Sequence, residues 1–350
     1  SSDLMSMICR TTTYSSEDQI CSKRMDGEAT MRRNIDLETI LKKHELYRDY
    51  PGKGCRANLG WADLSGVDLS GRYLSGVQGY RIKLNRAQCQ RTYFDDVYFL
   101  RGQLKGIDAS DAHFINAYIQ EADFEDAVMP RICAHRARFC GSNMRNADLR
   151  DADFTNALLC TVDFTDANLD GANFSGADLT GATLVHCSMN NVNMQDAELS
   201  LSTMQLLHAK NCNFRDAKFI ATDAHLSTFE DSNFEGAFFR QTDFRRTTLR
   251  GNRMTGAKFY NTILSGANLD KVYVQVNCAT YMDPPEETII TYCVDDDYVF
   301  YGTHEGTLAD FSAYIREKVY TKNKDLAFMY EGAVVYFKSI RNTLCPPVKE

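Results

Sequence analysis

Residues 147–151 read ADLRD and residues 172–181 read ANFSGADLTG, and these stretches decide the fold of the chain. Each unit contains a small residue, then Asp or Asn, then Leu or Phe, then two further residues. Followed outward in both directions, the phase holds from Leu59 to Val274, where 38 of 44 fifth positions are Leu, Phe, Met, Ile or Val. Two residues before each, 38 of 44 positions are Ala, Ser, Thr, Cys, Val or Gly. A period of five fits neither a helix nor a flat strand, so the repeat predicts an architecture of its own.

The repeat resembles that of the pentapeptide-repeat family, and the resemblance covers roughly 220 of the 350 residues. It implies an all-β solenoid, a right-handed quadrilateral β-helix in which four pentapeptides form one coil. The large and small residues then point inward, and the other three face solvent. A small side chain beside a large one lets a narrow coil close without overpacking. Forty-four units give about eleven coils and, at about 4.8 Å per coil, a rod roughly 50 Å long.

Residues 20 apart lie above one another in such a rod, so the sequence also predicts the contents of each column. Fifteen of the 20 Phe residues fall at the large inward position and are assigned to the core. Gly and Asn are frequent at the last position of the unit, for example Gly66, Gly171 and Gly181, where short turns are expected. Asn173, Asn193, Asn213 and Asn233 form an outward column that we interpret as coil-to-coil hydrogen bonding.

Four segments are predicted. Residues 1–34 form a polar N-terminal arm, and residues 35–56 hold a capping helix and linker, because Leu37, Ile40 and Leu41 have helical spacing. Residues 57–275 form the β-helix. Residues 276–350 form a small α+β domain, with a hairpin around Asp295–Asp297, a capping box at Thr307 and Asp310, and a further helix over 325–340. A solenoid needs caps because its terminal coils expose apolar cross-sections and strand edges.

Catalytic, cofactor and metal sites find no support in the sequence. There is no phosphate-binding Gly loop, no CxxC pair and no Cys/His cluster with zinc spacing. His113 and Cys133 share an outward column, but we interpret that pair as a surface coincidence. No stretch approaches 18 apolar residues, and no secretory signal is visible, so no membrane span and a cytoplasmic location are expected.

The cysteines are interpreted as reduced. Cys89, Cys187 and Cys212 occupy inward positions, where Cys acts as a small hydrophobe. Cys140 and Cys160 are 20 residues apart in one outward column, so their Cα atoms should lie about 5 Å apart, within disulfide range. We nevertheless expect free thiols there, because disulfides are rare in a reducing compartment.

Exposed aromatic residues suggest a protein-binding surface on the first coils. Tyr73 and Tyr93 share one outward column, and Tyr98 with Tyr118 shares the next. Arg81 and Arg101 stack beside them. Tyr and Arg on a rigid wall are typical of interface cores. The alternative is that the N-terminal arm or the capping helix covers this patch.

Charge supports a second hypothesis. From Asp148 to Glu198 there are nine acidic residues against Arg150 alone, although the whole rod counts 26 acids against 22 bases. Some pentapeptide-repeat proteins resemble B-form DNA and occupy the DNA-binding saddle of gyrase-type topoisomerases. A corresponding acidic face would consist of Asp148, Asp153, Asp163, Asp166 and Asp178. The Asp residues also have a structural explanation, since their side chains can bond to turn amides.

The favoured function is therefore a non-enzymatic scaffold or adaptor that binds protein partners, without cofactor and without direct contact to nucleic acid or membrane. The alternative is a DNA mimic that inhibits a topoisomerase or another DNA-binding enzyme. A third hypothesis is a bacterial effector or viral component in which the repeat is a spacer. Dimerisation through the C-terminal domain is a further expectation.

Overall fold

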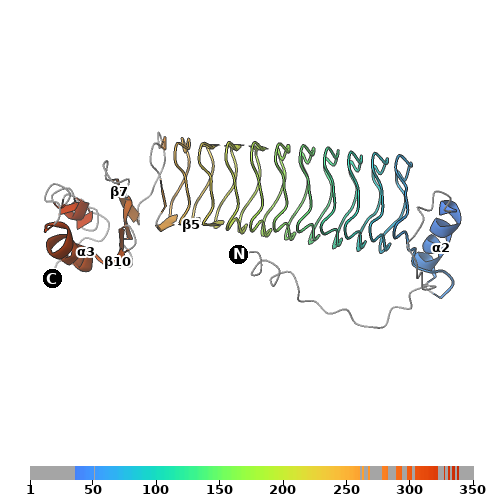
Figure 1. The fold of residues 1–350 in the computed structure, drawn as a ribbon, viewed down its shortest axis with the longest axis horizontal. Coiled ribbons are helices and arrows are strands. Elements are labelled where there is room, and N and C mark those ends of the chain that lie inside the picture. Colours follow the sequence, from blue (N-terminus) through green and yellow to red (C-terminus); the bar gives the residue numbers. More distant parts are fainter. Residues whose placement is uncertain are drawn as a thin grey trace, which may run out of the picture.

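The computed structural model describes residues 36–50, 52–260, 262, 263, 267, 268, 278–282, 289–293, 298–301, 304–321, 327, 330, 331, 333–335, 337 and 338. The predicted arm at 1–34 and the hairpin tip at Asp295–Asp297 lie outside these residues. Figure 1 shows a rod of stacked coils with helix α2 (Leu37–Asp49) at one end and the C-terminal elements beyond the other.

The rod is held together by parallel pairing between residues 20 apart. Ladder 1 pairs every twentieth residue from 58 to 258, ladder 2 from 63 to 263, ladder 3 from 68 to 268 and ladder 4 from 73 to 253. Ladder 3 includes strands β1 (Ser188–Asn190), β2 (His208–Lys210) and β4 (Thr228–Glu230). Ladder 1 includes β3 (Lys218–Ile220), β5 (Phe238–Arg240) and β6 (Lys258–Tyr260). The predicted β-solenoid is confirmed.

The interior consists of the two predicted columns. All fully described large positions from Leu59 to Met254 are buried, and aromatic rings stack from coil to coil. The Phe94–Phe114 and Phe154–Phe174 ring centroids are each 5.0 Å apart. Burial of Cys89, Cys187 and Cys212 is also confirmed, and it raises the pKa of the Cys212 thiol to about 12. These thiols are therefore inert core groups.

Two exceptions to the repeat have physical causes. Gly79 stands at a large inward position because a Cβ there would lie 2.6 Å from the Phe99 ring of the next coil. Arg72 stands at a small inward position because its guanidinium binds the carboxylate of Glu38 in α2 at 2.7 Å. The first exception makes room for a ring and the second anchors the cap.

The coils turn at what we call corners, the last position of each unit. Every fifth residue from Trp61 to Gly256 has a positive φ, and of these 40 residues 29 are not glycine and 11 are. The Asp or Asn side chain of the ladder frequently accepts a hydrogen bond from the amide two residues later, as from Ser70 to Asp68 at 2.9 Å. This local bond secures the predicted turns.

Helix α2 closes the first coil as predicted. The carboxylate of Asp36 accepts a hydrogen bond from the amide of Thr39 at 3.1 Å, which caps the helix. Leu41 and His44 are buried against the coil, and Nδ1 of His44 accepts a hydrogen bond from the amide of Ala57 at 3.3 Å. Unpaired amides of the terminal coil are thus partly satisfied by the cap.

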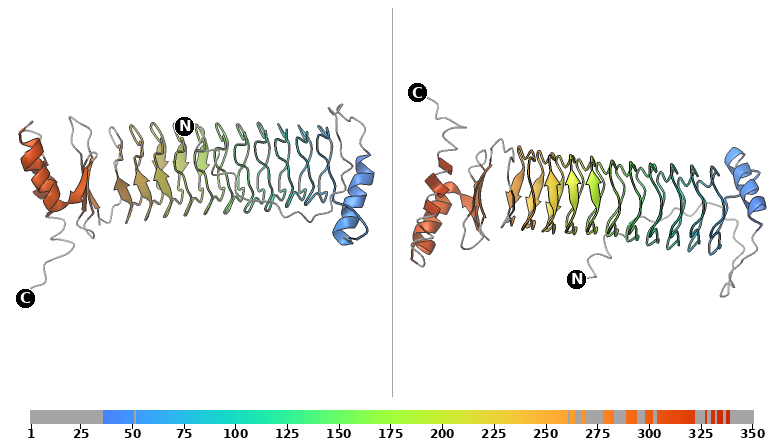
Figure 2. Two further views of the ribbon diagram at one scale, coloured as in Figure 1. Left: turned by 60° about the horizontal axis from the view of Figure 1, so that its bottom comes forward. Right: turned by 90° about the horizontal axis from the view of Figure 1, so that it is seen from above.

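The C-terminal elements begin with strands that lie beyond the last coils (Figure 2). They form a four-stranded antiparallel sheet in the order β10-β9-β8-β7. Its strands are β7 (Cys278–Met282), β8 (Ile289–Cys293), β9 (Tyr298–Tyr301) and β10 (His304–Thr307). The predicted hairpin corresponds to β8 and β9. The two outer strands, β7 and β10, were not predicted. Helix α3 (Leu308–Tyr314) starts with the predicted capping box and continues into a π-helix, η1 (Ile315–Val319). All described residues between 325 and 340 are helical.

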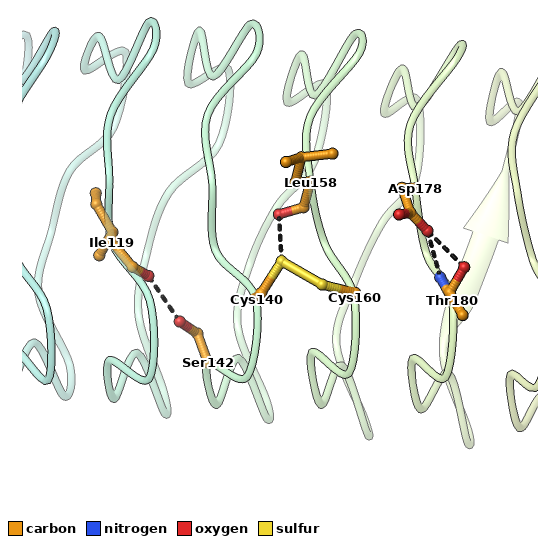
Figure 3. The surroundings of a disulfide bond; sticks show 7 residues. All are labelled: Ile119, Cys140, Ser142, Leu158, Cys160, Asp178 and Thr180. Atoms are coloured by element: carbon orange, nitrogen blue, oxygen red, sulfur yellow. Dashed lines mark hydrogen bonds between the residues drawn. A yellow bond between two sulfur atoms is a disulfide. The ribbon is translucent and has the colours of Figure 1, made fainter. Parts of the chain in front are cut away.

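One expectation about the cysteines is wrong. The structure joins Cys140 and Cys160 by a disulfide across adjacent coils, and their Cα atoms are 4.7 Å apart (Figure 3). The coil spacing placed the pair within reach, as predicted. The expected free thiols followed from an assumed reducing compartment, which the geometry does not support for this pair.

Candidate functional site

The first coils carry a group of aromatic and cationic side chains that we call the aromatic surface: Trp61, Tyr80, Arg81, Tyr98, Tyr118 and Arg138. Trp61 is the only tryptophan of the chain, and 51% of it is exposed. The guanidinium carbon of Arg81 lies 4.8 Å from the Trp61 ring centroid and 5.5 Å from that of Tyr80. These cation–π contacts fix large exposed rings in place.

The aromatic surface continues along ladder 1. Tyr98 and Tyr118 are paired neighbours in that ladder, as the 20-residue spacing predicted, and both are half-buried. The guanidinium carbon of Arg138 lies 4.8 Å from the Tyr118 ring centroid. Arg101 stands at the corner that corresponds to Arg81 in the next coil, 20 residues later, and binds the carboxylate of Glu121 at 2.6 Å. The structure therefore brings together Tyr98, Tyr118, Arg81 and Arg101 at one end of the rod.

Tyr73 belongs to a different environment, which corrects one site prediction. Its ring centroid lies 6.1 Å from that of His44, and the guanidinium carbon of Arg48 lies 4.6 Å from the ring. Both contacts come from α2, so Tyr73 is part of the cap interface rather than an open binding surface. Tyr93 is 41% exposed and stacks on His113, with ring centroids 4.7 Å apart. Tyr93 is therefore an exposed ring on ladder 4, outside the aromatic surface defined above.

Sequence reasoning missed Trp61. A signal was present, because a bulky aromatic residue at a corner occupies a left-handed backbone position that favours Gly, Asn and Asp. Trp61 has a φ of 62°. A residue that fits the turn poorly and remains exposed is a better indication of surface function than a residue that suits the turn.

The predicted acidic face does not exist as one face. Asp178 lies in ladder 1, Asp163 in ladder 2, Asp148 in ladder 3 and Asp153 in ladder 4. The fifth residue, Asp166, stands at a corner. The four ladders face different directions, so these carboxylates are distributed around the rod.

Local hydrogen bonds also occupy these carboxylates. Asp153, Asp163 and Asp178 each accept a hydrogen bond from the amide two residues later, at 2.9–3.0 Å. Hydrogen bonds from the Arg150 side chain lower the pKa of Asp148. The predicted turn chemistry therefore accounts for a large part of the acidity in mid-rod.

One group of side chains has the composition of a metal site. Asp223, His225 and Asp243 have potential ligand atoms within 4.8 Å of one another, and the described residues contain no other such group. The guanidinium of Arg245 binds Asp243 through two nitrogens, at distances down to 2.6 Å. A cation already occupies this carboxylate, which disfavours a metal ion. We assign no metal here.

The predicted Cys–His coincidence also remains without catalytic features. Cys133 and His113 pair in ladder 4, but burial raises the pKa of the Cys133 thiol. A nucleophilic cysteine requires the opposite shift. Within the described residues, no helix is long and apolar enough to cross a membrane.

Parallel pairing at a 20-residue interval around a continuous apolar interior defines a β-solenoid protein. The family model described as "Pentapeptide repeats" matches eight copies, at residues 135–159, 161–196, 212–251 and 227–266. The matched residues are therefore pentapeptide repeats, and the resemblance seen in the sequence is confirmed. No curated protein sequence matches the chain significantly.

Several solved structures are similar to the rod. HetL, a pentapeptide repeat protein involved in heterocyst differentiation regulation in Nostoc sp., is 22% identical, with a TM-score of 0.44 over 66% of this chain and 95% of HetL. QnrB1, a plasmid-mediated fluoroquinolone resistance protein, is 18% identical, with a TM-score of 0.35 over 63% of this chain and 92% of QnrB1. A pentapeptide repeat protein from the Arabidopsis thaliana thylakoid lumen is 29% identical, with a TM-score of 0.13 over 34% of this chain and 66% of that one. None of these likenesses assigns a function to the chain.

Proposed function

We propose that the chain is a non-enzymatic scaffold that binds a protein partner, built on a four-sided rod of about eleven coils. The C-terminal residues 276–350 form a separate small domain in this proposal. The rod contributes rigidity, because each ladder residue between the two ends is paired with the coil before it and the coil after it. A rigid surface loses little conformational entropy when it binds.

The aromatic surface is the observation that carries the proposal. It combines the exposed Trp61 with Tyr80, Tyr98 and Tyr118 and with the guanidinium groups of Arg81 and Arg138. Trp, Tyr and Arg are the residues that dominate binding free energy in protein interfaces. Arginine contacts hold the rings of Trp61, Tyr80 and Tyr118 on the outside of the rod, where a partner can contact them.

A pull-down from native lysate, followed by mass spectrometry, would identify the partner. The purified partner would then be titrated against the wild type and the Tyr98→Ala/Tyr118→Ala variant. As a matched control we choose Thr228→Ala/Thr248→Ala, a pair of ladder neighbours on ladder 3. The proposal expects at least a tenfold loss of affinity for the tyrosine variant and none for the control. Equal affinities of all three proteins would contradict it.

The second candidate is a DNA mimic, and the charge of the middle coils favours it. Residues 106–198 contain 15 acidic and 5 basic residues, a net charge of −10. Asp163→Asn with Asp178→Asn tests this candidate. If that variant no longer binds a DNA-binding enzyme while the tyrosine variant binds normally, mimicry replaces the adaptor function.

A further inference from the structure

Three exposed leucines gather at the borders of ladder 2, and we call them the leucine patch. Leu201 stands at the corner before ladder 2, and Leu206 and Leu226 stand at the corners after it, in adjacent coils. Their exposed fractions are 52%, 40% and 44%. Ala221, also exposed, stands at the last of the four corners that flank ladder 2 in these two coils.

The fold does not require leucine at these corners. The three residues have φ values of 57° to 60°, in the left-handed region that Leu rarely adopts. Most other corners hold Gly, Asn, Asp or Arg, which fit the turn or the solvent better. Leu at these sites is unfavourable for both backbone and solvation, so a contact outside the folded chain is the simplest reason for it.

The leucine patch lies where the charge of the rod changes sign. Residues 106–198 carry a net charge of −10, whereas residues 199–260 contain 9 basic and 6 acidic residues, a net charge of +3. Beside ladder 2, Arg246 follows the patch on the basic side, and His186 and then Asp166 precede it on the acidic side, 3.3 Å apart. A copy of the chain running in the opposite direction presents the reverse order, acidic against basic.

We propose that the leucine patch binds a second copy of this chain, with the two rods antiparallel and ladder 2 facing ladder 2. With the twofold axis between the coils of Leu206 and Leu226, each Leu206 lies opposite Leu226 of the second copy. Each Leu201 lies opposite Ala221 of the second copy. Arg246 then lies about one coil, roughly 4.8 Å along the rod, from Asp166 of the second copy. The contact is closed and self-complementary, so it stops at a dimer.

The oligomeric state tests the proposal. Sedimentation velocity of the full chain over a concentration series should show a dimer of twice 39.6 kDa that dissociates on dilution. Leu206→Asn with Leu226→Asn should weaken this dimer at least tenfold. Val128→Asn is the matched control, because Val128 is 40% exposed but lies on ladder 3. At a dilution where all proteins are monomers, the double Asn variant should melt a few degrees, roughly 2–4 °C, above the wild type, because Asn tolerates the left-handed turn.

A charge exchange tests the antiparallel arrangement. Arg246→Glu should weaken the dimer, and Arg246→Glu combined with Asp166→Arg should restore it. Within one chain these residues are four coils, about 19 Å, apart and do not touch, so restoration has to occur between copies. A monomer at all concentrations overturns the proposal, as does a dimer that tolerates the Asn changes. Protease sensitivity of residues 1–35 in the Asn variant, without any change of mass, assigns the patch to the N-terminal segment instead. None of these results would bear on the proposed binding of a protein partner to the aromatic surface.

Discussion

The first coil and the coils of residues 197–236 both place large apolar side chains at left-handed corners, but the neighbours of these side chains differ. Trp61 in the first coil contacts Tyr80 and the guanidinium of Arg81. The three leucines of the later coils protrude at corners with exposed fractions of 40% or more. The large inward positions of both regions are buried. Corner residues thus vary widely while the large inward positions of both regions stay buried.

The largest expected effect contrasts an inward position with a corner. Phe174→Asp places an unpaired carboxylate in a fully buried site and should cost about 4 kcal/mol or more, enough to unfold the neighbouring coils. Leu206→Asp at a corner should change stability by about 0.5 kcal/mol or less. Circular dichroism melts measure both. An unchanged melting temperature for Phe174→Asp would refute the assigned register.

A smaller effect is expected at Gly79, where the repeat consensus predicts a large side chain but the structure leaves no room for one. Gly79→Ala adds a Cβ that meets the Phe99 ring at 2.6 Å, so the variant should lose about 1–3 kcal/mol of stability. Gly102→Ala provides a comparison, since the nearest atom there is the flexible Leu104 Cδ1 at 2.8 Å. Urea unfolding should rank Gly79→Ala as the less stable variant. The reverse ranking would show that Phe99 adjusts easily.

The cap should respond to pH through His44. Burial lowers the pKa of His44 below its ordinary value of 6.5, so the unfolded chain takes up this proton first. The stabilisation is complete above about pH 6.5 and is lost as the pH falls toward the lowered value. Between about pH 8 and pH 5, the melting temperature of the wild type should fall more than that of His44→Gln. Parallel pH profiles for the two proteins would show that His44 does not cause the loss of stability at low pH.

The smallest expected effect on stability separates binding from folding. Tyr98→Ala with Tyr118→Ala should reduce partner binding by about 2 kcal/mol or more, while stability changes by about 0.5 kcal/mol or less. Both rings lie outside the core and are half-buried. A large drop in melting temperature, accompanied by new protease sensitivity of residues 1–34, would instead show that the arm docks on these rings.

The sequence predicted the fold well because a single phase determines which side chains point inward. It also placed Tyr98 and Tyr118 in one ladder and Cys140 near Cys160. The prediction of one acidic face was wrong, although the 20-residue period already excluded it. Asp148, Asp153, Asp163 and Asp178 are not multiples of 20 residues apart, so they cannot share a ladder.

Other features lay beyond the repeat. The contact of α2 with Tyr73 depends on how a helix docks, which has no periodic signal. The bonding state of Cys140 and Cys160 depends on redox chemistry as well as on distance. The repeat itself does not point to Trp61, because its period concerns the inward columns and Trp61 stands at a corner.

The salt dependence of partner binding tests the central claim most directly. The affinity of the isolated partner would be measured between about 50 mM and 500 mM NaCl. A binding surface centred on Trp61, Tyr98 and Tyr118 predicts a change in Kd of about threefold or less, because apolar and cation–π contacts are weakly screened. A fall in affinity of about 100-fold or more would contradict the account and show that the acidic middle of the rod binds the partner.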